Sequence, residues 1–188
     1  ARVGASGAKF FANAVDTETI GLDVVATYRL RQRLGDLALS AAGNYNRTEV
    51  DDELNIPPAL EGQEDTFFSP KERALLETSS PRTKLNLSAD YRRGPVSLFV
   101  QTVRFGEVTR NEYPFGVAQV HSPEWVVDAS LSYRVVEGAT LTVGANNLFN
   151  NYPDDQVFGN SYFGVFDYAP VQQGFNGAFY FARLGLRF

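Results

Sequence analysis

The chain ends in the stretch Ala178-Phe179-Tyr180-Phe181-Ala182-Arg183-Leu184-Gly185-Leu186-Arg187-Phe188, in which apolar residues recur at every second position. Successive side chains of a β-strand point to opposite faces of the sheet. One face of this strand therefore carries Tyr180, Ala182, Leu184, Leu186 and Phe188, whereas the other carries Arg183, Gly185 and Arg187. An apolar stripe that ends on an aromatic residue is typical of strands whose outer face meets lipid. The stretch predicts a transmembrane β-barrel.

The composition narrows the class of protein. The chain has 188 residues, no Cys and no Met, and its net charge is −5. Without Cys there is no disulfide framework and no thiolate metal site, and a single His adds no metal site, so we expect neither a metal nor a cofactor. The absence of Met predicts a processed chain or a piece of a longer one. A negative net charge argues against a nucleic-acid partner, and no apolar run is long enough for a transmembrane helix.

Alternation of apolar and polar residues recurs along the chain and predicts an all-β, antiparallel fold. The stretch 95–108 reads as a strand from its Val and Phe content, but the alternation does not decide which of its faces is apolar. Residues 8–14 are a possible eighth strand. The seven predicted strands are 19–31, 36–48, 82–92, 95–108, 124–135, 139–148 and 177–188.

The predicted connections alternate between short and long. The short ones are 31–36, 92–95 and 136–139, and the long ones are 48–81, 109–123 and 150–176. Outer-membrane barrels have short periplasmic turns and longer extracellular loops. We therefore expect the three long segments to be extracellular.

Three predicted strands end in Tyr-Arg just before a short turn, at Tyr28, Tyr91 and Tyr133. Together with Phe188 these residues predict an aromatic girdle at the periplasmic boundary. Trp125 opens a strand at the opposite boundary, where an interface anchor is the simplest interpretation. The alternative is a soluble sheet whose hairpins share Tyr-Arg.

The segment Leu141-Thr142-Val143-Gly144-Ala145-Asn146-Asn147-Leu148-Phe149-Asn150-Asn151-Tyr152-Pro153 resembles the penultimate strand of TonB-dependent outer-membrane receptors. That family commonly ends with an NLFN-x-Y element, a long loop and a last strand that closes in Phe. Residues 10–23 resemble another strand of the family, with Asp23 where Glu is usual.

The resemblance implies that residues 1–188 are the C-terminal part of a barrel of about 22 strands. The plug domain and the TonB-contacting box of the family are absent from this chain. The implied partners are the rest of the barrel and its plug, the TonB complex through the absent N-terminal part, the barrel assembly machinery, and outer-membrane lipid and lipopolysaccharide. The pattern Tyr180, Ala182, Leu184, Leu186 and Phe188 resembles the signal that the assembly machinery reads.

Candidate ligand contacts lie in the long loops. Aromatic residues near a barrel mouth stack on ligands, or else pack the loop on itself or meet the lipopolysaccharide zone. His121 faces a ferric ligand or is incidental. The acidic loop 48–81 binds a hard cation such as Ca²⁺ or is simply solvated, and solvation is favoured because no calcium-loop pattern is present. The candidate contacts are Tyr152, Phe158, Tyr162, Phe166, Tyr168 and His121.

The sequence thus favours part of a bacterial outer-membrane receptor that binds a small scarce solute, above all a ferric siderophore, and imports it with energy from the TonB complex. No arrangement of residues indicates catalysis, so we expect no enzyme. The lumen-facing charged residues are expected to bind each other or the plug. Two alternatives stay open: a small self-standing barrel that acts as a pore or structural protein, and a soluble β-sandwich that binds carbohydrate.

Overall fold

The computed structural model describes residues 13, 15–52, 54–58, 61–112 and 115–187. The possible eighth strand at 8–14 and the last residue, Phe188, lie outside these residues except for Asn13. The described elements are β1 (Thr17–Gln32), β2 (Gly35–Val50), α1 (Glu64–Phe67), α2 (Pro70–Glu77), β3 (Thr83–Arg93), β4 (Val96–Phe105), β5 (Val108–Asn111), β6 (Ala118–His121), β7 (Glu124–Val136), β8 (Ala139–Asn146) and β9 (Phe179–Leu186).

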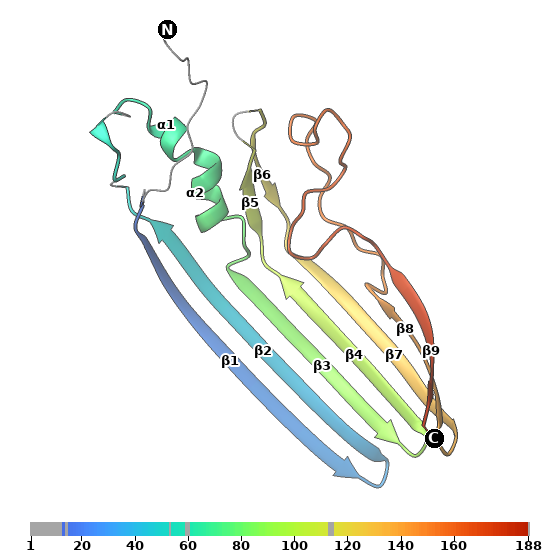
Figure 1. Cartoon of the computed structure of the whole chain (residues 1–188). Helices are drawn as coiled ribbons and strands as arrows, with labels where there is room; N and C mark the ends of the chain where they lie inside the picture. Colours follow the sequence, from blue (N-terminus) through green and yellow to red (C-terminus); the bar gives the residue numbers. More distant parts are fainter. Residues whose placement is uncertain (1–12, 14, 53, 59–60, 113–114, 188) are drawn as a thin grey trace.

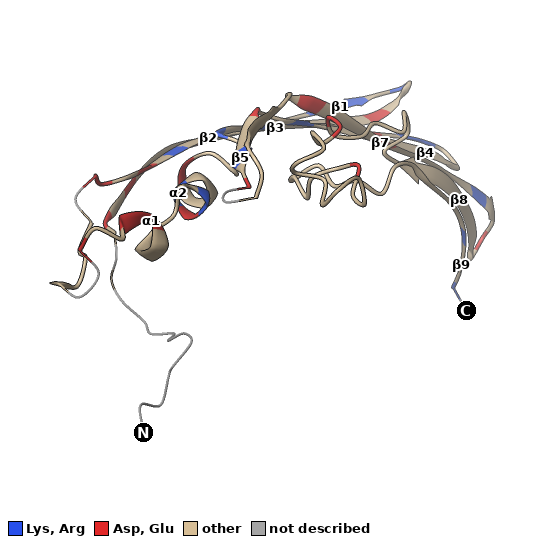
Figure 2. Ribbon diagram, turned by 90° about the horizontal axis from the view of Figure 1, so that it is seen from above, with Lys and Arg blue, Asp and Glu red and all other residues tan. Residues whose placement is uncertain are grey.

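Seven strands form one antiparallel sheet in the order β1-β2-β3-β4-β7-β8-β9, so neighbours along the chain are neighbours in space. All seven correspond to predicted strands, and the all-β antiparallel prediction is confirmed. The sheet curves strongly (Figure 2), but β1 and β9 lie at opposite edges and the barrel does not close within this chain. Among the described residues no second large sheet covers either face, as the alternative of a β-sandwich requires.

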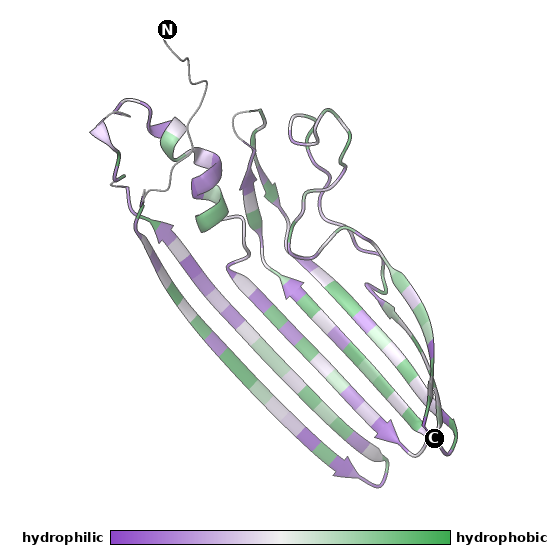
Figure 3. Ribbon diagram, viewed as in Figure 1, coloured by the Kyte–Doolittle hydropathy of each residue, from purple (hydrophilic) through white to green (hydrophobic). Residues whose placement is uncertain are grey.

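The register separates two faces of different chemistry, visible as alternating bands in Figure 3. One cross-strand row runs Tyr28, Leu39, Ala89, Val100, Ala129, Ala145 and Tyr180. The next row along the strands runs Arg29, Ala38, Asp90, Phe99, Ser130, Gly144 and Phe181. We call the apolar face outward and the mixed, more polar face luminal. The register also shows which face of β4 is outward: Leu98 and Val100 face outward, whereas Phe99 faces the lumen.

Short turns at 33–34, 94–95 and 137–138 gather at one end of the sheet, and the long connections gather at the other. Gly94 and Gly138 have φ values of 55° and 84°, a conformation that tight turns need and that Gly adopts without steric cost. The predicted alternation of short and long connections is confirmed. We call the end with the long connections extracellular.

The long connections hold more structure than the sequence predicts. The segment expected to be a loop at 109–123 contains the β5–β6 hairpin. The segment 48–81 contains α2, which begins directly after Ser69 with a complete capping box: Ser69 N donates to Glu72 Oε2 at 2.6 Å and Glu72 N donates to Ser69 Oγ at 3.3 Å. Pro70 occupies the first helical turn, where its missing N–H costs nothing.

Burial is sparse, because the sheet is a single layer. No large side chain among the described residues is completely buried, and outward residues such as Leu22 and Leu184 are 63% and 61% exposed. A face of this kind is stabilised by hydrocarbon rather than by a protein core. Within the described chain, no helix is long and apolar enough to cross a membrane.

Candidate functional site

The extracellular segments lock together at the mouth of the lumen. Thr109 N donates to Thr78 O at 2.9 Å, and Thr78 Oγ1 donates to Thr109 O at 2.8 Å, so the end of α2 is fastened to β5. Lys71 on α2 forms an ion pair with Glu112 at 2.6 Å. We call the assembly of α2, the β5–β6 hairpin and loop 150–176 the extracellular cap.

The β5–β6 hairpin is fastened to loop 150–176 by side-chain amides. Asn160 donates through Nδ2 to Val117 O at 3.0 Å and accepts from Val117 N at 2.8 Å, as a neighbouring strand would. Gln119 donates to Asp155 O at 2.8 Å and accepts from Val157 N at 3.0 Å. These four hydrogen bonds fix the loop on the hairpin.

A small apolar cluster lies inside the cap and holds its parts together. Val108, Ala169 and Val171 are buried together, between the hairpin and the later part of the loop. Gln172 donates to Ser79 O at 3.0 Å and so joins the loop to the segment after α2. Because three connections share these contacts, the cap forms one unit rather than three independent loops.

His121 lies inside the cap and not on its surface. Only 3% of the residue is exposed, and its Nδ1 has no hydrogen-bond partner within the described structure. Burial lowers the pKa of His121, and the nearby Arg110 lowers it further, whereas the carboxylates of Asp154 and Glu112 oppose the decrease. A buried, neutral imidazole of this kind offers a ligand almost no surface.

The carboxylates of Asp154 and Glu112, which lie near His121, accept hydrogen bonds from neighbouring groups. Ser122 N donates to Asp154 Oδ2 at 2.6 Å, and this backbone hydrogen bond lowers the pKa of Asp154. Burial raises the pKa of Glu112, but the hydrogen bonds from Lys71 and Arg110 outweigh burial, so the net shift is downward. Both carboxylates are therefore engaged in hydrogen bonds within the cap.

The predicted aromatic contacts fall into two groups. Tyr152 and Tyr168 stack on each other with ring centroids 5.0 Å apart, beside the bridge between Asp155 and Tyr168. They form the base of the loop. Phe158, Tyr162 and Phe166 lie further along and are 69%, 70% and 60% exposed.

Three exposed rings of this part of the loop contact one another. Phe163, which the sequence-based set omits, is 79% exposed and meets Phe158 and Tyr162 edge to face, with centroids 6.2 and 6.0 Å apart. Tyr162, Phe163 and Gly164 have φ values of 51°, 61° and 82°. Such a conformation costs about 1–2 kcal/mol for each non-Gly residue. We call Phe158, Tyr162, Phe163 and Phe166 the aromatic tip.

Ser161 maintains this left-handed turn from inside. The residue is buried, its Oγ donates to Phe158 O at 2.8 Å, and the same Oγ accepts from Gly164 N at 2.8 Å. Strained backbone of this kind persists only where its surroundings fix it, and it is concentrated at binding sites. Loop 150–176 lies on the concave, luminal side of the sheet (Figure 2). The turn that carries the aromatic tip therefore belongs to a loop on the luminal side of the sheet.

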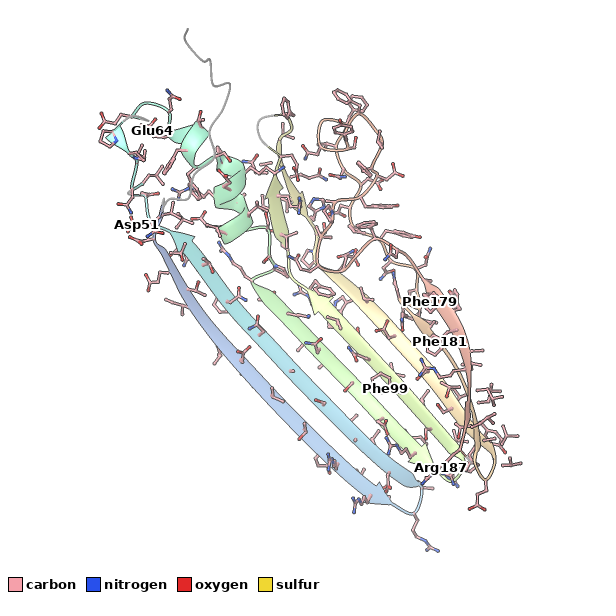
Figure 4. The ribbon with its side chains drawn as sticks, viewed as in Figure 1. Asp51, Glu64, Phe99, Phe179, Phe181 and Arg187 are labelled. Carbon is pink, nitrogen blue, oxygen red and sulfur yellow. The ribbon has the colours of Figure 1, made fainter. Side chains whose placement is uncertain are left out.

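The luminal wall below the cap is charged, and part of it is already paired. Asn44 donates to Asp23 at 2.7 Å, Arg92 pairs with Asp90 at 2.9 Å, and Asn147 N donates to Asp128 at 2.8 Å. Lys84 and Arg183 lie over the rings of Phe105 and Phe181. Of these contacts, the Arg92–Asp90 ion pair joins two charged lumen-facing groups, as expected, whereas Asp23 and Asp128 accept hydrogen bonds from asparagines instead. Figure 4 shows Phe99, Phe181 and Arg187 along this wall, with Asp51 and Glu64 at the extracellular end.

The asparagines that follow β8, at positions 147, 150 and 151, connect the last three strands of the sheet, β7, β8 and β9. Asn147 and Asn150 have φ values of 49° and 58°, a conformation that Asn tolerates better than most residues. Asn151 donates to Trp125 O at 2.7 Å, and Asn150 Oδ1 accepts from Ala178 N at 2.8 Å. The motif therefore fastens β7 to the end of β8 and guides the chain into β9.

The acidic loop shows no cation site. No cluster of His, Cys, Asp or Glu that could hold a metal occurs among the described residues. Arg73 pairs with Asp52 at 3.2 Å and with Glu77 at 3.5 Å, and it donates to Val50 O.

The register also positions the predicted girdle and the predicted assembly signal. Tyr28 lies level with Ala89, Tyr91 lies two residues further toward the periplasmic end, and Tyr133 lies two further again, opposite Val96. Tilted strands require this stepping if the three rings are to share one height. Tyr180, Ala182, Leu184 and Leu186 all lie on the outward face of β9.

A curved antiparallel sheet with an apolar outward face, a polar lumen, short turns at one end and a folded cap at the other defines the wall of a transmembrane β-barrel of the outer-membrane receptor type. Residues 2–148 match the family model described as TonB dependent receptor-like, beta-barrel. The chain therefore belongs to the TonB-dependent receptor-like β-barrel family. This is a family of receptors and transporters of the Gram-negative outer membrane, not typically of enzymes, and its members work with a plug domain and with TonB.

One solved structure, entitled "Structure of the FpvAI-pyocin S2 complex", is similar to this chain with a TM-score of 0.58 and 15% sequence identity. The similarity covers 91% of this chain and 19% of that one, and at this identity it concerns the fold. The chain thus spans about a fifth of the solved receptor chain that it resembles. No curated protein sequence matches it.

Proposed function

We propose that the complete protein binds a scarce extracellular solute, above all a ferric siderophore, and imports it across the outer membrane with energy from the TonB complex. Residues 1–188 supply wall strands and part of the mouth. A plug domain, the barrel assembly machinery, lipid and lipopolysaccharide are its further partners. The observation that carries the proposal is the aromatic tip, whose exposed rings are carried by a strained turn in a loop on the luminal side of the sheet.

The arrangement of the rings in the aromatic tip suits the binding of a solute from water. Preorganised aromatic rings bind a flat or apolar ligand surface without having to become ordered first. The cap holds these rings by hydrogen bonds from Asn160 and Ser161. The predicted contacts Tyr152 and Tyr168 stack on each other outside the tip, and buried His121 is left out of the proposed contact set.

Uptake by cells that express the full-length receptor tests this proposal. Radiolabelled iron chelates are supplied to a strain that lacks its own receptors, with and without a functional TonB complex. The variant Y162A/F163A is compared with L34A, which removes an exposed apolar side chain at a periplasmic turn. We expect TonB-dependent uptake that falls about tenfold or more in the tip variant, as for lost hot-spot aromatics, and stays unchanged in L34A.

Two results contradict the proposal in different ways. Equal uptake by the tip variant and L34A removes the aromatic tip from the ligand site. If no iron chelate is taken up in a TonB-dependent way, although receptor levels in the outer membrane are normal, the siderophore proposal is rejected. The same assay is then repeated with haem, cobalamin and glycans.

A further inference from the structure

The outward face carries an unusual cation near its extracellular edge. Arg104 is the second-last residue of β4, and the register places it between Leu85 and Trp125 on the apolar face. Its side chain forms no hydrogen bond or ion pair within the described part of the chain. Arg47 also faces outward at this end, but it is paired with Glu49. An unpaired guanidinium on a lipid-facing surface is a strong donor without an acceptor.

Arg104 borders a hollow in the outward surface. The hollow has a volume of ≈ 300 Å³, and its walls include Val24, Tyr45 and Leu85. Gly43 forms its floor: a Cβ at this position meets nothing nearer than Leu85 Cδ1 at 4.0 Å. The hollow is thus lined largely by apolar residues, lies on the face that we call outward, and has Lys84 and Arg104 as its charged lining residues.

A second apolar hollow continues the first toward the middle of the membrane. It measures ≈ 470 Å³ and includes Ala26, Ala41 and Ala89 among its lining residues. The row through Ala41 follows the row through Gly43 directly on the outward face, so the two hollows are consecutive. From Tyr45 to Leu39 the groove runs six residues along β2, which is about 20 Å along the strand at roughly 3.3 Å per residue.

The length and the charge of this groove point to one occupant. A strand tilted by about 40° descends roughly 15 Å over that length, which is the depth of hydrocarbon in one leaflet. Small residues form the floor along β2, and the outward-facing cation Arg104 lies at the extracellular end of the groove. Lys84 also lines this end, but it lies over the ring of Phe105. We propose that the groove holds an acyl chain of the phosphorylated glycolipid of the outer leaflet, with the Arg104 guanidinium on its phosphate. Planar, bidentate pairing makes Arg well suited to phosphate.

This lipid site is independent of the solute that the receptor imports, because it faces away from the lumen. It depends on the placement of the sheet in the outer membrane. A phosphate on an outer-leaflet lipid also suits the level of Trp125, since aromatic rings anchor at the membrane boundary.

The test uses the full-length receptor, delipidated in detergent and titrated with defined lipids while bound lipid is counted by native mass spectrometry. The probes are bis-phosphorylated lipid A, the same lipid without phosphates, and phosphatidylglycerol. R104Q removes the cation, and G43L fills the floor of the groove without changing the charge. The matched control is R93Q, which removes an Arg from the same face at the periplasmic end of β3. Heat-modifiable migration shows that each variant is folded.

We expect the wild type and R93Q to bind lipid A about tenfold more tightly than its dephosphorylated form, as one charge-assisted contact would give. R104Q should lose this preference, and G43L should bind both forms more weakly. Equal binding of lipid A by R104Q and the wild type overturns the proposal. Equal binding of phosphatidylglycerol and lipid A also overturns it, because the site then accepts any anionic lipid. If R104Q does not fold, unchanged binding by G43L overturns the proposal on its own.

Discussion

Asn160 and Val117 lie 43 residues apart in the sequence, yet they exchange two hydrogen bonds in the cap, from Val117 N to Asn160 Oδ1 and from Asn160 Nδ2 to Val117 O. A side-chain amide here takes the place of a neighbouring strand. Through this contact the edge of the β5–β6 hairpin is protected, and the aromatic tip is fixed in position.

Replacing Asn160 with Ala should loosen the cap without unfolding the barrel. The loss of two hydrogen bonds at a partly buried position costs about 1–3 kcal/mol. Hydrogen exchange of the full-length receptor should show faster exchange in 115–121 and 150–176, with unchanged protection of β2 and β3. N55A, at an exposed loop position, is the control. Unchanged exchange in both segments would show that the hairpin and the loop are held by other contacts.

Gly144 should not tolerate a side chain, whereas Gly43 should. A Cβ at Gly144 lies 2.6 Å from Phe181 Cζ and 2.7 Å from Ala129 O, while one at Gly43 has open space. G144A should therefore destabilise the barrel by about 1–3 kcal/mol, as overpacking does, and G43A should be close to neutral. Urea unfolding in lipid vesicles measures both. Equal midpoints for the two variants would mean that Phe181 moves aside freely.

His121 should make the cap sensitive to mild acid. Its pKa is lowered in the folded state from the usual 6.5, because burial disfavours the charged form. The contribution of neutral His121 to the stability of the cap is therefore complete above pH 6.5 and decreases as the pH falls below that value. Hydrogen exchange of 108–112 and 115–121 should quicken, after correction for intrinsic rates, between about pH 7 and pH 5.5. H121Q should flatten this dependence, and a dependence that persists in H121Q would assign it to another group.

Phe188 should contribute to assembly of the barrel. Its position at the end of an outward apolar stripe resembles the signal that the assembly machinery reads. F188D should lower the amount of heat-modifiable receptor in outer-membrane fractions, whereas R187Q, which changes the lumen-facing neighbour, should have little effect. Equal amounts of both variants and wild type would leave Phe188 without this role.

The sequence alone determined the seven strands and, except for β4, their outward faces. Alternation of apolar and polar residues, broken only by Val25 in Leu22 to Leu30 and by Phe181 in Tyr180 to Phe188, is a local pattern typical of a half-buried strand. The positions of the short turns followed from the same pattern, because each turn lies where the alternation of one strand ends and that of the next begins.

Only the tertiary structure decided the face of β4, the β5–β6 hairpin, the buried position of His121 and the strained turn at Phe163. The strands of the hairpin are too short to carry a periodic signal, and contacts from Asn160 and Gln119 stabilise them. The groove beside Arg104 likewise depends on register, because Gly43, Leu85 and Arg104 come from three strands and become neighbours only when those strands pair. Contacts between distant residues have no local pattern, and for this reason the sequence by itself did not reveal them.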